Sequence, residues 1–365
     1  MNFHHFVYLE NGELWGFGNN DEDQLMLSFS ADKNGINLIE DPVLIMQDFE
    51  IRQIACGDGF TLMLKNNGEL WLFGLEQRSV KVMVDVNIKD IFCEKEHSII
   101  LKNNGDIFNF SHNFNKMDLL VNCPDVKQIA CGLNYTVILK KDDTILIFGK
   151  NRYNFNSIKN IDKIICGRNH IFVLDNSNNL YISGDNAYNQ FGDMSNISEY
   201  SLRLFDNFGT RSICSGADHT MILKNNGELC GFGYNAQEQL GLDHSDSVNG
   251  VISIMNDVDK VICGFNSTVI LKNNELWFAG DIYGCGKYGR RRLHLLKKFD
   301  DVKIIGINGI RFGNIEWKPE YNDKLSKETK DIIFMFLMVC RYFDVKYKVK
   351  MVKYMKYEVI KYLFY

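Results

Sequence analysis

Histidines recur at one position of a repeated phrase in this sequence, and histidine can act as a general base or bind a metal ion. His97, His170 and His219 occupy this position, and His4 fits it in the first copy of the phrase. A histidine that returns at the corner of successive repeats is typical of a hydrogen-bonded structural residue. We therefore interpret these histidines as scaffold and expect no catalytic residue among them.

Cysteines are the second set of residues whose types could do chemistry. The chain has 10 cysteines but no Cys-x-x-Cys pair, so a tetrahedral zinc site has no local pair of ligands. Five of them share one small position of the repeated phrase: Cys56, Cys93, Cys131, Cys166 and Cys263. Such a position suits cysteine as a small hydrophobic residue. The sequence therefore predicts free thiols in a reducing compartment, with no metal site and no cofactor.

The repeated phrase itself indicates the architecture that positions these residues. "LKNNGELWLFG" at 64–74 returns as "LKNNGELCGFG" at 223–233, and a truncated first copy spans 4–18. Six longer copies begin at Ile54, Ile91, Ile129, Ile164, Ile213 and Val261. The chain therefore contains seven copies of one structural unit, and such units stabilise one another by stacking.

Each copy reads as strand, turn, strand, turn, strand, because short apolar and β-branched runs alternate with turn residues. The pair Asn67–Gly68 predicts a type I′ hairpin, which needs positive φ at both central residues. A single hairpin cannot bury both of its faces, so neighbouring copies must cover each other.

Two more positions of the phrase have structural interpretations. A glycine follows the small position and suits a strand end where backbones approach closely. These glycines are Gly57, Gly132, Gly167, Gly216 and Gly264. Trp15, Trp71 and Trp277 share another position and are expected to pack between copies.

The phrase resembles the repeat of the regulator of chromosome condensation family, which has a Gly-x-x-His-Ser/Thr corner, an Asn-Gly or Asp-Gly turn and a Gly-Gln-Leu-Gly tail. The tail is matched by "YNAQEQLGL" at 234–242 and, in altered form, by 185–193 and 19–27. The resemblance implies an all-β fold, a seven-bladed β-propeller over 1–316.

Closure of the propeller can be argued from the sequence. The first copy lacks its innermost strand, and "DVKIIGING" at 301–309 is a strand-like segment without a partner. Because an open edge is a hazard, we expect 302–306 to complete the blade begun by 4–18, with Gly306 in the glycine position.

Long connections between copies are the expected binding loops, since loops vary while blades do not. They span 19–50, 185–211 and 234–260. The founding member of the family is a nucleotide exchange factor that presents a β-wedge from an early-middle blade. The corresponding copies here carry almost no insertion, so the resemblance leaves exchange activity open without favouring it.

One basic cluster lies in the connection after the last copy, at 286–298. We expect a solvated loop there, which is also a candidate docking site for an acidic protein surface or a phosphate backbone. Its residues are Arg290, Arg291, Arg292, Lys297 and Lys298.

The composition changes after 316, and 317–365 is predicted to be a C-terminal helical segment with two amphipathic helices. This segment resembles one attached to repeat proteins of giant amoeba-infecting viruses and is also similar to small helical adaptor boxes of ubiquitin ligases. The first resemblance implies a viral protein acting in a host cell. The second implies a receptor that brings substrates to a ligase.

Charge and hydropathy exclude several classes of partner. The net charge is −5, divided as +5 from Lys318 onward and −10 before it, so nucleic acid is a poor partner for the acidic propeller. The first residues do not have a basic region followed by an apolar stretch, so we expect no secretory signal, and the most apolar run, 331–340, is about half the length of a membrane helix. We expect a monomer in the cytoplasm or nucleus, without membrane contact.

The leading hypothesis is a non-enzymatic scaffold for protein–protein interaction, because repeat positions account for every candidate catalytic residue. Two alternatives remain open. One is a guanine-nucleotide exchange factor for a small GTPase, and the other is a substrate receptor for a ubiquitin ligase. Under all three the partner is a protein.

Overall fold

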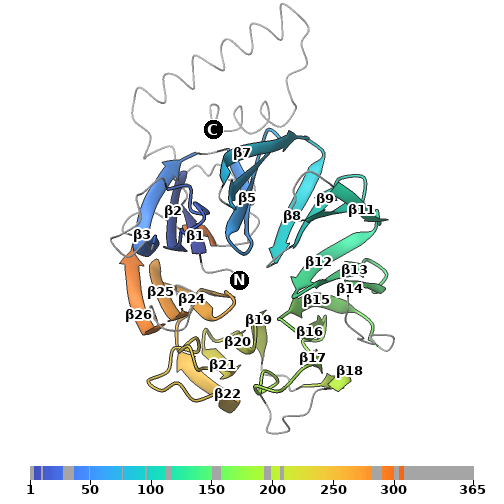
Figure 1. The fold of residues 1–365 in the computed structure, drawn as a ribbon. Helices are drawn as coiled ribbons and strands as arrows, with labels where there is room; N and C mark the ends of the chain where they lie inside the picture. The colour runs from blue at the N-terminus through green and yellow to red at the C-terminus, as the bar shows by residue number, and fades with distance from the viewer. Residues whose placement is uncertain are drawn as a thin grey trace, which may run out of the picture. The chain divides into compact units, whose positions relative to one another are not determined.

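The computed structural model describes residues 4–9, 11–27, 37–48, 50–75, 77–94, 97–111, 117–149, 158–192, 199–205, 209–281, 290–299 and 304–307. These residues form seven β-sheets that follow one another around a ring (Figure 1), which confirms the predicted seven-bladed β-propeller. The predicted C-terminal helices lie outside the described residues, and the domain division at 316 stays a prediction.

Six blades have four strands, and the fourth blade has three in its described part. Blade 1 contains β27 (Ile304–Ile307), β1 (His4–Leu9), β2 (Glu13–Asn19) and β3 (Leu38–Gln47). Blade 2 contains β4 (Ile51–Cys56), β5 (Phe60–Lys65), β6 (Glu69–Gly74) and β7 (Gln77–Val84). Blade 3 contains β8 (Ile88–Glu94), β9 (His97–Lys102), β10 (Asp106–Ser111) and β11 (Met117–Asn122). Blade 4 contains β12 (Val126–Gly132), β13 (Tyr135–Lys140) and β14 (Ile145–Gly149).

The remaining blades follow the same order from the innermost strand outward. Blade 5 contains β15 (Ile161–Cys166), β16 (His170–Asp175), β17 (Leu180–Gly184) and β18 (Glu199–Leu204). Blade 6 contains β19 (Thr210–Ser215), β20 (His219–Lys224), β21 (Leu229–Gly233) and β22 (Val248–Met255). Blade 7 contains β23 (Lys260–Cys263), β24 (Ser267–Lys272), β25 (Glu275–Asp281) and β26 (Arg290–Lys298).

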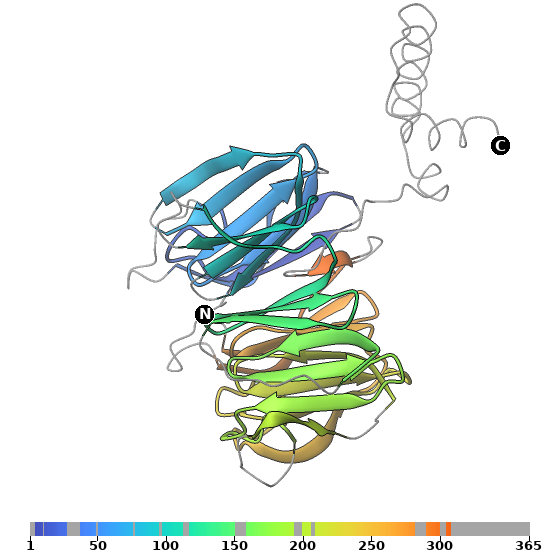
Figure 2. The same ribbon diagram turned by 90° about the vertical axis from the view of Figure 1, so that its right-hand side faces the viewer.

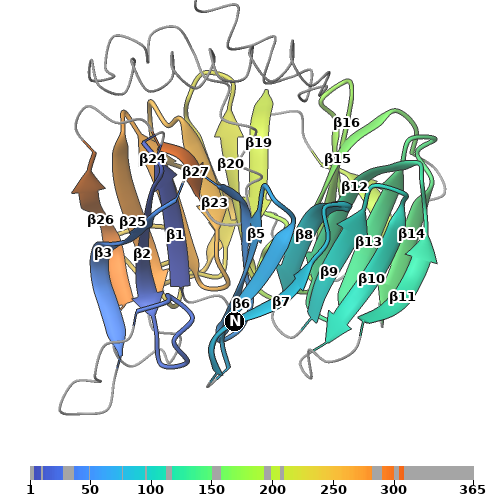
Figure 3. The same ribbon diagram turned by 90° about the horizontal axis from the view of Figure 1, so that it is seen from above.

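Blade 1 is completed by a strand from the far end of the propeller sequence, as predicted. The strand β27 pairs antiparallel with β1, with Val7 opposite Ile307 and Tyr8 opposite Gly306 (Figure 3). The prediction that Gly306 fills the glycine position is wrong. In blade 4 that glycine, Gly132, pairs with the first residue of the second strand, whereas Gly306 pairs with the fifth residue of β1.

The predicted type I′ turn is wrong for the Asn-Gly copies. In blade 2 the turn from Lys65 to Gly68 is closed by a hydrogen bond from the Gly68 amide to the Lys65 carbonyl, 3.0 Å, and Gly68 has φ 84° while Asn67 is not in the positive-φ region. This is a three-residue loop ending in a left-handed glycine. The shorter turn of blade 7 has positive φ at both Asn273 and Asn274, so the type I′ requirement is met there instead.

The fourth strand of each complete blade comes from the connections between repeats. The strands β3, β18 and β22 lie inside connections that the sequence analysis treated as loops (Figures 1 and 2). The expectation of a solvated loop at the basic cluster is likewise corrected, because 290–298 is β26 and pairs with β25. Outer strands face solvent on one side, and their sequences lack the repeat that reveals the inner ones.

The hydrophobic core lies between blades. Between blades 7 and 1, for example, Phe17 and Val7 pack against Val269 and Phe278, and all four side chains are at most 1 % exposed. The ring of Trp15 meets that of Phe299 across the same boundary, 5.6 Å between centroids. Since each blade buries its faces only against its neighbours, the ring is what stabilises the separate hairpins.

Candidate interaction site on the corner face

The corner of a blade joins its innermost strand to the second strand, and the recurring glycine is needed there because a ring lies against it. A Cβ on Gly167 would come within 2.1 Å of the His170 ring, and one on Gly216 within 2.1 Å of the His219 ring. The expected backbone crowding is also present at Gly216, where the carbonyl oxygen of Gly264 in the next blade would lie 2.6 Å from a Cβ. Glycine alone leaves room for the ring.

The corner histidines are enclosed by protein. His4, His170 and His219 are fully buried, and burial lowers their pKa values to about 3, 4 and 3 respectively. The Nε2 atom of His4 lies 2.7 Å from Thr61 Oγ1 in the next blade, and that of His219 lies 3.2 Å from Thr268 Oγ1. At neutral pH these rings are uncharged and out of contact with solvent, which fits a structural role.

A turn after the third strand fastens some blades to the next one. We call it the tail turn, and it occupies 19–27, 185–192 and 234–242 in blades 1, 5 and 6. The Thr61 hydroxyl donates to the Gln24 carbonyl of the preceding tail turn at 2.8 Å. The same bond joins Thr220 to Gln190 at 3.1 Å and Thr268 to Gln239 at 2.7 Å.

Corners and tail turns lie on the same side of the propeller, which we call the corner face. Strand register places the start of β16 opposite the end of β17, with His170 facing Gly184. The amide of Tyr234 in a tail turn donates to the carbonyl of Asp218 in the adjoining corner, 2.8 Å. Loops from several blades therefore form one continuous surface.

Successive corners are also joined directly around the axis. The Leu133 amide donates to the Arg168 carbonyl at 3.2 Å, the Arg168 amide to the Ala217 carbonyl at 3.1 Å, and the Ala217 amide to the Phe265 carbonyl at 2.8 Å. Each of these residues directly follows a repeat glycine. The bonds hold the corners of blades 4 to 7 in one fixed arc.

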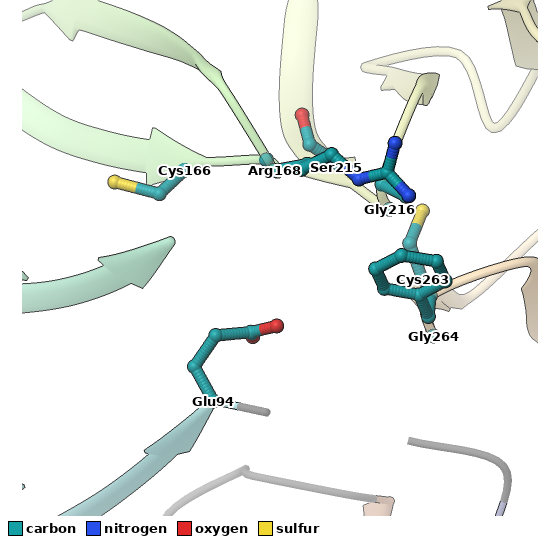
Figure 4. Close-up of a pocket in the computed structure, with 10 residues that line it drawn as sticks. Glu94, Cys166, Arg168, Ser215, Gly216, Cys263 and Gly264 are labelled. Carbon is teal, nitrogen blue, oxygen red and sulfur yellow. The ribbon is translucent and has the colours of Figure 1, made fainter. Parts of the chain in front are cut away.

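A cavity of about 50 Å³ opens inside this arc (Figure 4). Glu94 enters it from blade 3, opposite Arg168, Ser215 and Cys263 from blades 5 to 7. Arg168 Nε and Ser215 Oγ are buried and have no hydrogen-bond partner among the described residues. The cavity thus has a carboxylate on one side and, on the other, residues that carry two buried polar atoms without a hydrogen bond.

A partly buried ion pair holds the arginine at the edge of this cavity. Arg168 Nη1 lies 3.2 Å from Asp218 Oδ2, and its guanidinium carbon lies 4.9 Å from the centre of the Phe265 ring. Burial raises the pKa of Asp218 to about 6, with the nearby charge of Asp185 adding to the rise and Arg168 opposing it.

Sequence reasoning missed Glu94, Arg168 and Asp218 as site residues. A signal was present for Glu94, since it stands where other copies have the repeat glycine and pairs with His97 as those glycines pair with the corner residue. Arg168 and Asp218 vary from copy to copy and carry no such signal. The closed propeller brings these three residues together from blades 3, 5 and 6.

The structure describes the two lysine side chains of the basic cluster. Lys297 Nζ lies over the Trp15 ring at 3.8 Å from its centroid, and Lys298 lies 3.8 Å from the Glu275 carboxylate. These two lysines therefore contact the blades. The side chains of Arg290, Arg291 and Arg292, like that of His97, lie outside the described residues.

The described part of the chain contains no group of three His, Cys, Asp or Glu side chains arranged to hold a metal ion. None of its elements is a helix long and apolar enough to cross a membrane.

Comparison with known sequences identifies the repeat. Two sequence profiles of the regulator of chromosome condensation (RCC1) repeat match the chain, one at 11–64 and the other at 126–154 and 161–190. The X-linked retinitis pigmentosa GTPase regulator homolog of Caenorhabditis elegans is 31% identical over 86 residues, which is 22% of this chain and 6% of that relative. This chain thus matches only a small part of that longer protein.

Solved structures with the same fold include two of yeast RCC1, which is also called Prp20. Prp20p of Saccharomyces cerevisiae, described with its binding to Gsp1p and histones, has a TM-score of 0.62 at 16% identity, covering 88% of this chain and 95% of that one. Yeast RCC1 (Prp20) bound to Kap60 also has a TM-score of 0.62, at 16% identity and 81% and 84% coverage. Human WBSCR16 has a TM-score of 0.61 at 17% identity, covering 80% and 94%. At these identities the likeness shows the fold.

Proposed function

Because this chain is a seven-bladed propeller of regulator of chromosome condensation repeats, we propose that it is a scaffold for protein–protein interaction with no catalytic group of its own. One observation carries the proposal. The corner histidines His4, His170 and His219, which have the side chains best suited to acid–base chemistry, are 0 % exposed and packed inside the blades. The corner face exposes its loops to solvent and not these histidines.

The proposed contact surface on the corner face is the arc from blade 5 to blade 7. Tyr188 and Tyr234 from adjacent tail turns form an edge-to-face pair, 5.1 Å between ring centroids, and Tyr188 is 43 % exposed. An exposed tyrosine near an ion pair such as Arg168–Asp218 is typical of interaction surfaces, since it offers a rigid apolar area with a polar edge.

The first experiment is capture of partners from host cytosol by the full chain, with mass spectrometry, followed by affinity measurement with the purified partner. We expect Tyr188→Ala to weaken binding by about tenfold or more. Leu119→Ala is the matched control, because Leu119 is 57 % exposed on the outer strand β11, away from the corner arc. Equal affinity of the two variants would place the partner elsewhere. Recovery of a cullin-type adaptor would favour the ubiquitin-ligase alternative.

The basic strand β26 is the second candidate surface. If an acidic partner binds it, changing Arg290, Arg291 and Arg292 together to serine should weaken binding and flatten its dependence on salt, because exposed charges are screened over about 10 Å at 0.1 M salt. The control is Lys163→Ser, since the Lys163 side chain is 55% exposed on another blade. Unchanged salt dependence of the triple variant would remove β26 from the interface.

Nucleotide exchange on a small GTPase is the second candidate function. It is favoured by relatives whose names refer to GTPase regulation and to binding of Gsp1p. Against it, only residues 75–76 separate β6 from β7, so blade 2 has no insertion there to act as a wedge. The test is release of fluorescent GDP from small GTPases captured by the full chain. The scaffold proposal expects no acceleration, and an acceleration of about tenfold or more would establish exchange activity instead.

A further inference from the structure

Two cysteines from neighbouring blades meet beside the axial cavity. Cys214 lies on β19 and Cys263 on β23, the innermost strands of blades 6 and 7, and their sulfur atoms are 2.6 Å apart. Two unbonded sulfur atoms do not rest so close together, whereas a disulfide bond is about 2.0 Å long. The backbones therefore already hold the two sulfurs near bonding position.

The repeat explains why this pair meets and the others do not. Cys263 occupies the small position that also holds Cys131 and Cys166, while Cys214 stands one residue earlier in its copy, where Ser215 takes the small position. Successive side chains of a strand point to opposite sides. A residue at the earlier position of one blade therefore faces the small position of the next blade. Among the described residues, Cys214 and Cys263 are the one cysteine pair with this offset on adjacent blades.

The cavity of the corner face lies beside this pair. Cys263 is one of the residues that line the cavity, together with Arg168 and Ser215 (Figure 4), so a small oxidant that enters the cavity lies next to this cysteine. Burial raises the pKa of the Cys263 thiol well above its ordinary value, which keeps the thiol protonated at neutral pH. Both cysteines are free thiols, and the protonated Cys263 reacts only slowly with an oxidant.

We propose that Cys214 and Cys263 form an oxidation site, at which a peroxide joins the two thiols into a disulfide between blades 6 and 7. The Cys263 sulfur attacks one peroxide oxygen and the O–O bond breaks. The thiol proton leaves with the other oxygen as water, and Cys263 becomes a sulfenic acid. The Cys214 sulfur then attacks that sulfenic sulfur, the S–O bond breaks, and the hydroxide leaves with the Cys214 proton as a second water. Two thiols are oxidised and one peroxide is reduced to two waters.

The disulfide would restrain the propeller between blades 6 and 7, beside the cavity. It closes a loop of 49 residues and joins two inner strands that end directly before the repeat glycines Gly216 and Gly264, which line the cavity. A cross-link of this kind stabilises a fold mainly by restricting its unfolded chain. Oxidation should therefore raise the unfolding temperature and hold the cavity wall in one geometry, and a reductant should reverse both effects.

The experiment treats the full chain with hydrogen peroxide, blocks remaining thiols with N-ethylmaleimide and maps peptides without reduction. We expect one cross-linked pair, containing Cys214 and Cys263 and lighter by two hydrogens, formed faster as the pH is raised, because the thiolate is the attacking form. The unfolding temperature should rise with it and return to its starting value after dithiothreitol.

Two variants keep the test decisive. Cys263→Ser should abolish both the cross-link and the reversible rise in unfolding temperature, whereas Cys131→Ser, a change at the same repeat position in blade 4, should leave both intact. The proposal is overturned if Cys214 and Cys263 both remain open to N-ethylmaleimide after other cysteines have oxidised. It is equally overturned if the cross-link joins Cys131 to Cys166, or if Cys263 accumulates as a sulfinic acid without a partner.

Discussion

A few side chains at the corners determine how neighbouring blades pack. The example of His219 shows how such a side chain fills the space beside a glycine. The ring of His219 lies where Gly216 has no side chain, and its Nε2 reaches Thr268 of the next blade. Thr268 in turn donates to the carbonyl of Gln239 in the tail turn. These three contacts link the packing inside blade 6 to hydrogen bonds between blades 6 and 7.

Replacing this histidine should reduce stability without touching an exposed surface. We expect His219→Ala to lower the free energy of unfolding by about 2–4 kcal/mol, because it leaves a void beside Gly216 and removes a hydrogen bond to Thr268. Chemical denaturation of His219→Ala and of the exposed control His244→Ala measures the difference. A His219→Ala protein that unfolds like the control yet loses its partner would show that the ring belongs to a binding site.

Turns and the closing strand decide how the elements connect. The Asn-Gly loops end in left-handed glycines whose surroundings differ from blade to blade. A Cβ on Gly68, at φ 84°, would lie 2.6 Å from the backbone nitrogen of Val86, while one on Gly227, at φ 85°, would lie 3.5 Å from the nearest atom, the Cα of Asp257. The energetic cost of a positive φ can therefore be measured separately from the cost of a crowded Cβ.

Alanine at these two glycines tests that separation. Gly227→Ala should lower the free energy of unfolding by about 1 kcal/mol, the cost of a left-handed alanine alone. Gly68→Ala should lower it by more than about 2 kcal/mol, because the backbone of Val86 must also move. Urea denaturation of both variants gives the values, and equal losses would mean that the loop of blade 2 relaxes freely.

The closing strand allows a test by truncation. Removal of 299–365 takes away β27 and should destabilise the entire propeller, since β1 then has an open edge in place of its partner. Removal of 318–365 keeps β27 and should leave the propeller folded. Thermal unfolding followed by circular dichroism compares both with the full chain. Two truncations that melt together at the full-length temperature would show that β27 contributes nothing to closure.

At the scale of the whole molecule, buried histidines make the propeller sensitive to acid. Burial lowers the pKa values of His4, His5 and His219 to about 3 and of His170 to about 4. The unfolded chain takes up protons on these residues below about pH 6.5 while the folded ring excludes them. Stability therefore falls as the pH is lowered through this range.

The expected loss is about 1.4 kcal/mol per pH unit for each such histidine between about pH 6.5 and 4. Asp218 acts in the opposite direction, because its raised pKa lets the folded state hold a proton near pH 6, but it is one group against four. Urea midpoints at pH 7.5, 6 and 5 measure the slope. Constant stability across these values would show that the rings are protonated in the folded protein.

The fold could be predicted because one phrase repeats seven times. The candidate site could not, because its residues vary from copy to copy. Seven copies of one phrase were enough to predict the blades and the closing strand. The turn type was mistaken because the letters Asn-Gly are shared by two-residue and three-residue loops, and the register of the two strands, with Leu64 opposite Leu70, distinguishes them. Outer strands lie in connections outside the repeated phrase, and the cluster of Glu94, Arg168 and Asp218 depends on contacts between blades, which no single copy records.

The pairing of β27 with β1 also has a consequence for synthesis on the ribosome. Residues 304–307 are translated after all the strands of the other six blades, so β1 waits for its partner while about 295 further residues are added. At about 5–20 residues per second, this wait lasts on the order of 15–60 s. During that time the apolar strand "HHFVYL" is an open edge, available to another nascent chain. On crowded polysomes the expected error is an exchanged strand, with β27 of one molecule completing blade 1 of its neighbour.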